Sequence, residues 1–225
     1  TGWRIFDLIV IPISYDEAWT YLNFSSKNIL VSASYYPAPN NHVLFSIITV
    51  ISNILPFDPK INIRIPSLFF TIASFLLVFF MLKKLFNFKA AILASCLFLV
   101  SYPVALYSIY ARGYALYILF TILCFYSFFE IIFNDTKNAN MYWFLFALSN
   151  IFGFYTMPCF LYPALSFCIF GSLLFMLKMD FRNLRRLLFF ELIISIGALI
   201  LYSPVFFING IMSVIGNKYV ERKGY

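Results

Sequence analysis

Charged side chains are scarce in this chain of 225 residues: they make up 11% of it, with 9 acidic residues and a single histidine. Soluble globular domains carry about 25% charged and about 45–50% apolar residues. Here 63% of the residues are hydrophobic and 22% are aromatic. The shortage of charge excludes a soluble domain and predicts an all-α polytopic membrane protein.

Cysteine is also sparse, and its pattern excludes two kinds of site. The four cysteines lie inside apolar runs and form no Cys-x-x-Cys pair, so neither a disulfide framework nor a zinc site is indicated. The net charge of +7 comes from short basic clusters between apolar stretches. A polar surface with a basic patch is absent, which argues against nucleic-acid binding.

Several apolar runs approach the roughly 20 residues that cross a hydrocarbon core of about 30 Å. A shorter run from His42 to Leu55 has a length typical of an interfacial helix. We expect one transmembrane domain, with an outer loop at 4–64, a bundle at 65–207 and the start of a further outer segment at 208–225. The expected spans are 65–82, 89–106, 114–133, 141–157, 159–178 and 187–207.

Basic residues in the short loops predict the orientation, because cytoplasmic loops are enriched in lysine and arginine. The side with more of them carries Lys83, Lys84, Lys89, Lys137, Lys178, Arg182, Arg185 and Arg186. We therefore expect the opposite side, with the first loop and the turn at Arg112, to face out of a bacterial inner (plasma) membrane. The chain opens without methionine and stops without a terminating element, so we expect a fragment truncated at both ends.

Asp16 and Glu17 are adjacent carboxylates in the outer loop, where acidic groups can act as general bases or metal ligands. Ser14 and Glu17 fit a capping box, which predicts a helix that begins at Tyr15. The alternative interpretation is that both carboxylates only complement the positive end of this helix.

Two further outer residues have side chains suited to an anionic substrate. His42, at the start of the short helix, can bind a substrate or cap the helix. Arg112 is flanked by Tyr110 and Tyr114, and its planar guanidinium suits phosphate while the aromatic rings suit a sugar or a lipid headgroup. The alternative for Arg112 is an arginine that extends to the membrane interface.

Five segments occur in a fixed order: Tyr15–Leu22, Asn40–His42, Arg64–Leu68, Lys83–Phe86 and Ala111–Tyr114. Their order and spacing over residues 3–133 resemble the amino-terminal half of GT-C type, polyprenyl-phosphate-sugar-dependent glycosyltransferases. These enzymes are related to the protein O-mannosyltransferases and to the lipid A aminoarabinose and galacturonic acid transferases. One departure is Val43-Leu44, where the family often has two prolines after the histidine.

The resemblance implies an enzyme that moves a sugar from a polyprenyl-phosphate carrier to a protein, lipid or glycan acceptor at the outer face. It implies that Asp16 is catalytic, with Glu17 as its companion. The residues that it implies for substrate binding are His42, Arg64, Arg112 and Tyr114. No cofactor is required by these residues, and a divalent cation, where one is used, would depend on Asp16 because no metal-ligand cluster occurs.

Two other functions are compatible with the composition. A transporter should place ionisable residues or paired helix breaks near the middle of the bilayer. Glu130 and Glu191 lie toward the expected cytoplasmic ends of their spans, although Pro103 and Pro163 interrupt helices. The other alternative is a non-catalytic subunit of a membrane assembly, in which the acidic loop has no chemical role.

Overall fold

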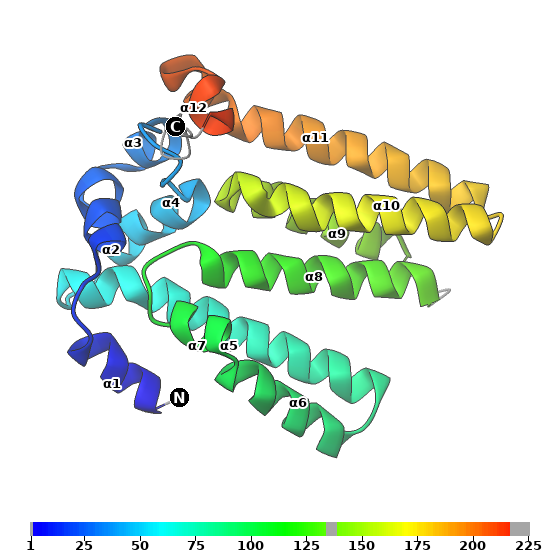
Figure 1. Cartoon of the computed structure of the whole chain (residues 1–225), viewed down its shortest axis with the longest axis horizontal. Coiled ribbons are helices and arrows are strands. Elements are labelled where there is room, and N and C mark those ends of the chain that lie inside the picture. The colour runs from blue at the N-terminus through cyan, green and yellow to red at the C-terminus, as the bar shows by residue number, and fades with distance from the viewer. Residues whose placement is uncertain (1, 134–138, 217–225) are drawn as a thin grey trace, which may run out of the picture.

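The computed structural model describes residues 2–133 and 139–216, and within these ranges every regular element is helical (Figure 1). This confirms the all-α fold class. Lys137, which contributes to the predicted orientation, lies outside the described residues.

Among the described residues, four helices are long and apolar enough to cross a membrane. They are α5 (Pro59–Leu85), α8 (Tyr114–Phe133), η2 with α10 (Pro158–Phe160 and Leu161–Leu177) and α11 (Phe181–Asn209). In Figure 1, α8, α10 and α11 lie nearly parallel, and α5 runs beside them at an angle. Their length and composition support an integral membrane protein.

The span expected at 89–106 is divided into α6 (Phe88–Val100) and α7 (Tyr102–Tyr107). Ser101, at φ −59° and ψ 137°, leaves the helical conformation between them. Pro103 lies in the first turn of α7, where its missing N–H needs no intrahelical partner, so the chain starts a separate helix after Ser101. With 13 residues, α6 falls short of the roughly 20 that a span requires.

The span expected at 141–157 forms as α9 (Ala139–Thr156), but this helix is not among the four apolar ones. It contacts α8 and α11 extensively, and Trp143, Phe146 and Asn150 on it are buried. The indole ring of Trp143 stacks on Phe190 of α11 with 5.3 Å between ring centroids. Because neighbouring helices cover α9, it can carry polar residues that a lipid-facing helix would expose. Six spans are therefore not confirmed.

Helix α5 begins at Pro59, six positions before the expected start at residue 65. Asp58 caps the helix, since its Oδ1 accepts a hydrogen bond of 2.8 Å from the N–H of Lys60. Proline suits the first turn of a helix, where its missing N–H has no intrahelical partner. As a result, Arg64 belongs to a rigid helix and not to the outer loop.

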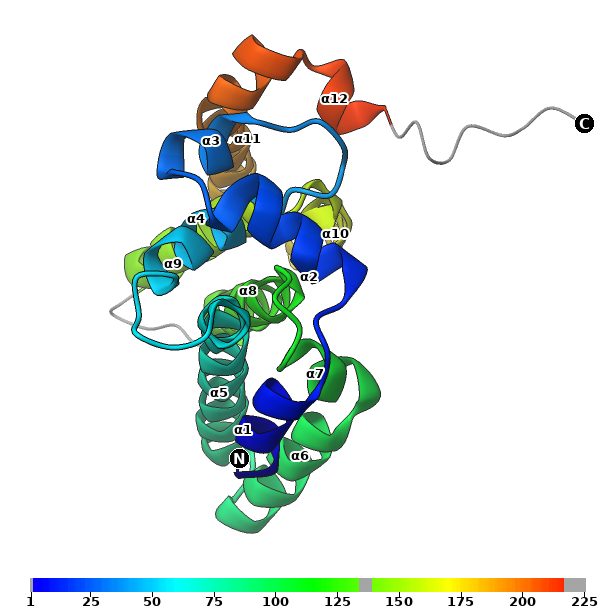
Figure 2. The same ribbon diagram turned by 90° about the vertical axis from the view of Figure 1, so that its left-hand side faces the viewer.

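The short helices gather at one end of the bundle, which faces the viewer in Figure 2. They are α1 (Gly2–Val10), α2 (Tyr15–Thr20), the π-helix η1 (Tyr21–Ser25), α3 (Ile29–Ser34), α4 (Val43–Ser52) and α12 (Met212–Ile215). The α5–α6 and α10–α11 connections lie at the other end, with Lys83 and Lys178 in or beside them. Basic loops and the acidic segment thus occupy opposite ends of the bundle.

The short helix expected after His42 is present as α4, and part of it is buried inside the protein. Val43, Phe45 and Thr49 are fully buried, and α4 packs against α3, α5, η1 and α9. Ile51 stays exposed on the opposite face. Through these contacts α4 joins the short helices to the long ones.

Candidate functional site

The predicted capping box is present at the start of α2. Ser14 Oγ accepts a hydrogen bond of 3.3 Å from the N–H of Glu17, and Glu17 Oε2 accepts one of 2.9 Å from the N–H of Ser14. The helix begins at Tyr15, as predicted. Successive residues of a helix differ by about 100° in direction, so the box directs Glu17 inward and leaves Asp16 exposed.

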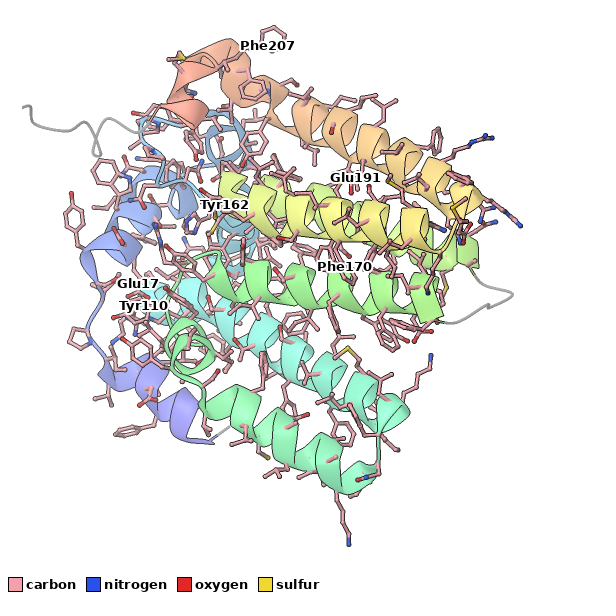
Figure 3. The ribbon with its side chains drawn as sticks, turned by 45° about the vertical axis from the view of Figure 1, so that its right-hand side comes forward. Glu17, Tyr110, Tyr162, Phe170, Glu191 and Phe207 are labelled. Carbon is pink, nitrogen blue, oxygen red and sulfur yellow. The ribbon has the colours of Figure 1, made fainter. Side chains whose placement is uncertain are left out.

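Glu17 and Arg64 form a buried ion pair, with exposed fractions of 0% and 1%. Arg64 Nε lies 2.7 Å from Glu17 Oε1, and Arg64 Nη2 lies 2.8 Å from Glu17 Oε2. This is the two-pronged geometry in which arginine binds carboxylates most strongly. Figure 3 shows Glu17 beside Tyr110, which precedes α8.

All other hydrogen-bonding positions of this pair are also occupied. Arg64 donates to the carbonyls of Leu8, Ile11 and Pro12 at 2.9–3.1 Å, so each of its five N–H groups has an acceptor. Glu17 Oε1 also accepts from the N–H of Ala111 at 2.9 Å. The Glu17–Arg64 pair therefore connects the α1–α2 linker, α5 and the segment before α8, with no donor left for a substrate.

The environment of Glu17 lowers its pKa. Burial acts to raise the pKa, but the hydrogen bond from Arg64, those from the N–H groups of Ser14 and Ala111, and the charge of Arg64 outweigh burial. A carboxylate that is ionised and already accepts several hydrogen bonds is a poor general base. For Glu17 the geometry thus agrees with the structural alternative.

Arg112 is the second buried arginine, with 6% of its surface exposed. Its Nη1 donates to Thr20 Oγ1 at 3.3 Å and to the carbonyl of Asn40 at 3.2 Å, and its Nη2 donates to Asn40 Oδ1. Within the described residues, its Nε is buried without a partner and no carboxylate pairs with it. Leaving a buried donor unpaired costs about 1–3 kcal/mol. The low exposure argues against an arginine that simply extends to the interface.

His42 lies against Arg112 and is more than nine-tenths buried. It occupies the N-cap position of α4 but makes no side-chain cap there. Instead its Nδ1 accepts a hydrogen bond of 2.7 Å from the N–H of Gly113. Burial and the charge of Arg112 lower the pKa of His42 well below its ordinary value of 6.5, so the ring is neutral at physiological pH.

Aromatic rings and a glycine hold His42 in this place. The ring of Tyr114 contacts His42 edge to face at 5.2 Å and stacks on Tyr107 at 4.1 Å. A Cβ atom at Gly113 would lie 2.9 Å from the side chains of both His42 and Thr156. Only glycine allows this close approach of the segment before α8 to the histidine.

Asp16 is exposed on α2, one turn before the point where Arg112 reaches that helix. Thr20 Oγ1 donates to the carbonyl of Asp16 at 2.9 Å and accepts from Arg112. Residues four apart share one helix face, with Cβ atoms about 5–6 Å apart. The exposed Asp16 and the buried Arg112 are thus linked through Thr20 at this end of the molecule.

The structure sorts the six predicted residues into two groups and one exposed carboxylate. Glu17 and Arg64 form one group, and the Arg112–His42 cluster, which includes Tyr114, forms the other. Four partners were not predicted as site residues: Thr20, Asn40, Tyr107 and Gly113. The available signal was the glycine directly after an arginine, which indicates a close backbone approach.

A cavity of about 300 Å³ lies at the same end of the molecule, on the loop that leads to Asn40. It is lined by Tyr36, Pro37, Ala38, Pro39, Asn209, Met212, Ser213 and Gly216. In the part of the chain that the structure describes, no three His, Cys, Asp or Glu side chains are grouped to hold a metal ion. A divalent cation would have to combine Asp16 with oxygens of a substrate.

Comparison with protein-family models, with curated proteins and with solved structures found no match.

Proposed function

We propose that this chain is part of a membrane glycosyltransferase that moves a sugar from a polyprenyl-phosphate carrier to a protein, lipid or glycan acceptor at the outward face of a bacterial inner membrane. The observation that carries the proposal is Arg112, a buried cation without a carboxylate partner among the described residues, which contacts Thr20 one helical turn after the exposed Asp16. A cation for a phosphate and a free carboxylate for a hydroxyl are the two groups that this transfer needs.

The reaction follows from these two groups. The acceptor hydroxyl attacks the anomeric carbon of the sugar, the bond from that carbon to the phosphate oxygen breaks, and its electron pair leaves with the carrier phosphate. Asp16 takes the proton of the hydroxyl, a role typically worth about 10²–10⁴-fold in rate. Arg112 stabilises the charge on the departing phosphate, and removing one such donor typically costs about 10²–10³-fold.

In this scheme Glu17 and Arg64 position the other groups and do not contact the substrate. Their hydrogen bonds hold the start of α2, and with it Asp16, against α5 and the segment that carries Arg112. The isoprenoid chain of the carrier and the membrane lipids would contact the exposed apolar side chains of the long helices, such as Phe69 on α5 and Phe207 on α11.

Transfer of labelled sugar by membranes that contain the full-length protein tests this proposal. Polyprenyl-phosphate sugars serve as donors, and the label is followed into protein, lipid and glycan. We expect Asp16→Asn to lower transfer by about 10²–10⁴-fold, and Asp16→Glu to keep part of it.

Asp180→Asn is the matched control for this experiment. Asp180 caps α11 at the other end of the bundle, and asparagine caps helices as well as aspartate does. We expect this variant to transfer sugar normally. Wild-type transfer by Asp16→Asn, or no transfer by the wild-type protein from any donor, would contradict the proposal. An inert assembly subunit predicts the second result.

One observation favours a transporter as the second candidate. Glu191 lies in α11 beside α10 (Figure 3), and its Oε1 is buried without a hydrogen-bond partner among the described residues. An ionisable side chain inside a span is often functional. A transporter should lose solute flux on Glu191→Gln and keep it on Asp16→Asn, whereas a transferase should show the opposite pattern.

A further inference from the structure

The hydrogen bond between His42 and Gly113 determines which ring nitrogen carries the proton. A backbone N–H can only donate, so Nδ1, which lies 2.7 Å from the Gly113 nitrogen, must present its lone pair. A neutral imidazole has one donor and one acceptor nitrogen. The proton of His42 is therefore on Nε2.

The donor at Nε2 has no acceptor in the described part of the chain. Among these residues, the polar atom within hydrogen-bonding distance of Nε2 is Arg112 Nη2 at 3.5 Å, and this atom is itself a donor. Arg112 Nε is a further buried N–H group without a partner. Two adjacent side chains, both more than nine-tenths buried, thus offer N–H groups that lack an acceptor in residues 2–133 and 139–216.

We infer that His42 binds the phosphate of the polyprenyl carrier as a neutral donor through Nε2–H, next to Arg112, with Gly113 holding the required tautomer. This inference rests on the proposed transferase function and assigns His42 a role in binding the substrate phosphate. Arg112 supplies one positive charge, and the His42 donor adds a hydrogen bond without adding charge. This combination matches the single negative charge of a phosphodiester such as a polyprenyl-phosphate sugar.

The same geometry excludes His42 as the general base. A second proton would have to enter at Nδ1, where it would meet the N–H of Gly113. It would also add a positive charge beside Arg112, and Tyr114 on α8 offers no compensating anion. Proton removal is thus left to Asp16, while His42 keeps the leaving group in place.

Two substitutions of similar size separate the two ring nitrogens. The amide oxygen in His42→Asn takes the place of Nδ1 and can accept from Gly113, but this variant has no group at the position of Nε2. The amide nitrogen in His42→Gln reaches the position of Nε2 and can donate there. The probe is monomethyl farnesyl phosphate, a phosphodiester with one negative charge, and its dissociation constant is measured on the full-length protein in detergent.

We expect His42→Asn to weaken binding of the probe by about 10- to 100-fold, the usual effect of losing a hydrogen bond to a charged group. His42→Gln should bind the probe within a few-fold of the wild-type protein.

An equal loss of binding in His42→Asn and His42→Gln would overturn the inference, since it would indicate a structural role. Normal binding by His42→Asn together with weak binding by Arg112→Met would overturn the inference but leave the proposed function intact. Normal binding of the probe by both His42→Asn and Arg112→Met would contradict a phosphate site at these two residues.

Nitrogen NMR of histidine-labelled protein gives a readout that a structural role would not change. The signals of His42 are identified by their absence in His42→Asn. Addition of the probe should shift the Nε2 resonance and leave Nδ1 as a non-protonated nitrogen. A proton on Nδ1, or an Nε2 resonance that does not respond to saturating probe, would overturn the inference.

Discussion

Two arginines are buried at the same end of this molecule, and they differ in how completely they are paired. Arg64 has an acceptor for each of its five N–H groups, including both oxygens of Glu17. Arg112 has neutral acceptors only, and its Nε has none among the described residues. Equal burial therefore does not mean equal pairing: the protein satisfies every N–H group of Arg64, whereas Arg112 keeps an N–H group without an acceptor among the described residues.

The energetic reason lies in the cost of burying charge. A buried ion pair is tolerable only when geometry and additional hydrogen bonds compensate for lost hydration. The Glu17–Arg64 pair meets this condition, and so it stabilises the junction of α1, α2 and α5. The Arg112–His42 cluster does not, and an incompletely paired polar group in a folded protein often marks a functional site.

Replacing each arginine by methionine tests this difference most strongly. Arg64→Met leaves Glu17 buried without its counter-charge, and we expect a loss of about 3–5 kcal/mol in the free energy of unfolding. Arg112→Met leaves no charge unpaired and should cost less, while it removes binding of the phosphodiester probe. Denaturant unfolding in detergent measures both variants. A larger loss of stability for Arg112→Met than for Arg64→Met would show that the comparison is wrong.

Acid should weaken the Glu17–Arg64 pair only below pH 4.5, whereas the Arg112–His42 cluster should lose stability already below pH 6.5, because the unfolded chain protonates His42 there and the buried ring stays neutral. The folded-state pKa of Glu17 is lowered from 4.5, so the stability that its charge contributes is present above pH 4.5 and is lost as the pH falls through the lowered pKa. The loss should be smaller than that of Arg64→Met, because protonated Glu17 keeps part of its hydrogen bonds. Unfolding measured against pH gives the slope. Glu17→Gln should flatten this slope below pH 4.5, and an unchanged slope there would assign the acid sensitivity to another titratable group.

A methyl group at position 113 should disturb the Arg112–His42 cluster and leave the Glu17–Arg64 pair unchanged. The new Cβ in Gly113→Ala would lie 2.9 Å from His42 and Thr156, and overpacking of this kind typically costs about 1–3 kcal/mol. Displacement of His42 should also weaken binding of the probe. Gly210→Ala is the control: Gly210 has φ 78° and no neighbouring atom within 4 Å of an added Cβ. That variant should lose stability through backbone strain and bind the probe normally.

The smallest effect is expected from the helix cap. Ser14→Ala removes the hydroxyl that accepts from the N–H of Glu17, at a cost of about 1 kcal/mol. Asn28→Ala removes the comparable cap of α3, where Asn28 Oδ1 accepts from the N–H of Val31 at 2.9 Å. We expect similar losses of stability and no change in binding of the probe. Weaker binding of the probe in Ser14→Ala, but not in Asn28→Ala, would mean that the Glu17–Arg64 pair and the Arg112–His42 cluster are coupled through α2.

Local signals in the sequence predicted several elements well. The capping box predicted the start of α2 at Tyr15, and the apolar run at 114–133 predicted α8. Both signals lie in residues that are close together in the chain. The expected span at 89–106 failed although Pro103 was visible, because a count of apolar residues does not register a break at Ser101.

The candidate site could be predicted only in part, and the two carboxylates show why. Asp16 and Glu17 are equivalent in sequence, yet one is exposed and the other is fully buried. The partner that decides this, Arg64, is 47 positions away. In the same way, the tautomer of His42 depends on the N–H of Gly113, which is 71 positions away.

Composition and local pattern alone determined that this protein is helical, rich in membrane-spanning segments and provided with acidic and basic groups outside them. These properties follow from hydrophobicity and from hydrogen bonds between near neighbours, which any sequence displays directly. Only the tertiary structure decided which charges neutralise each other inside the protein and which, among the described residues, are left without a counter-charge. Pairing of buried charge depends on distances between segments remote in the chain, and the packing of the helices determines those distances.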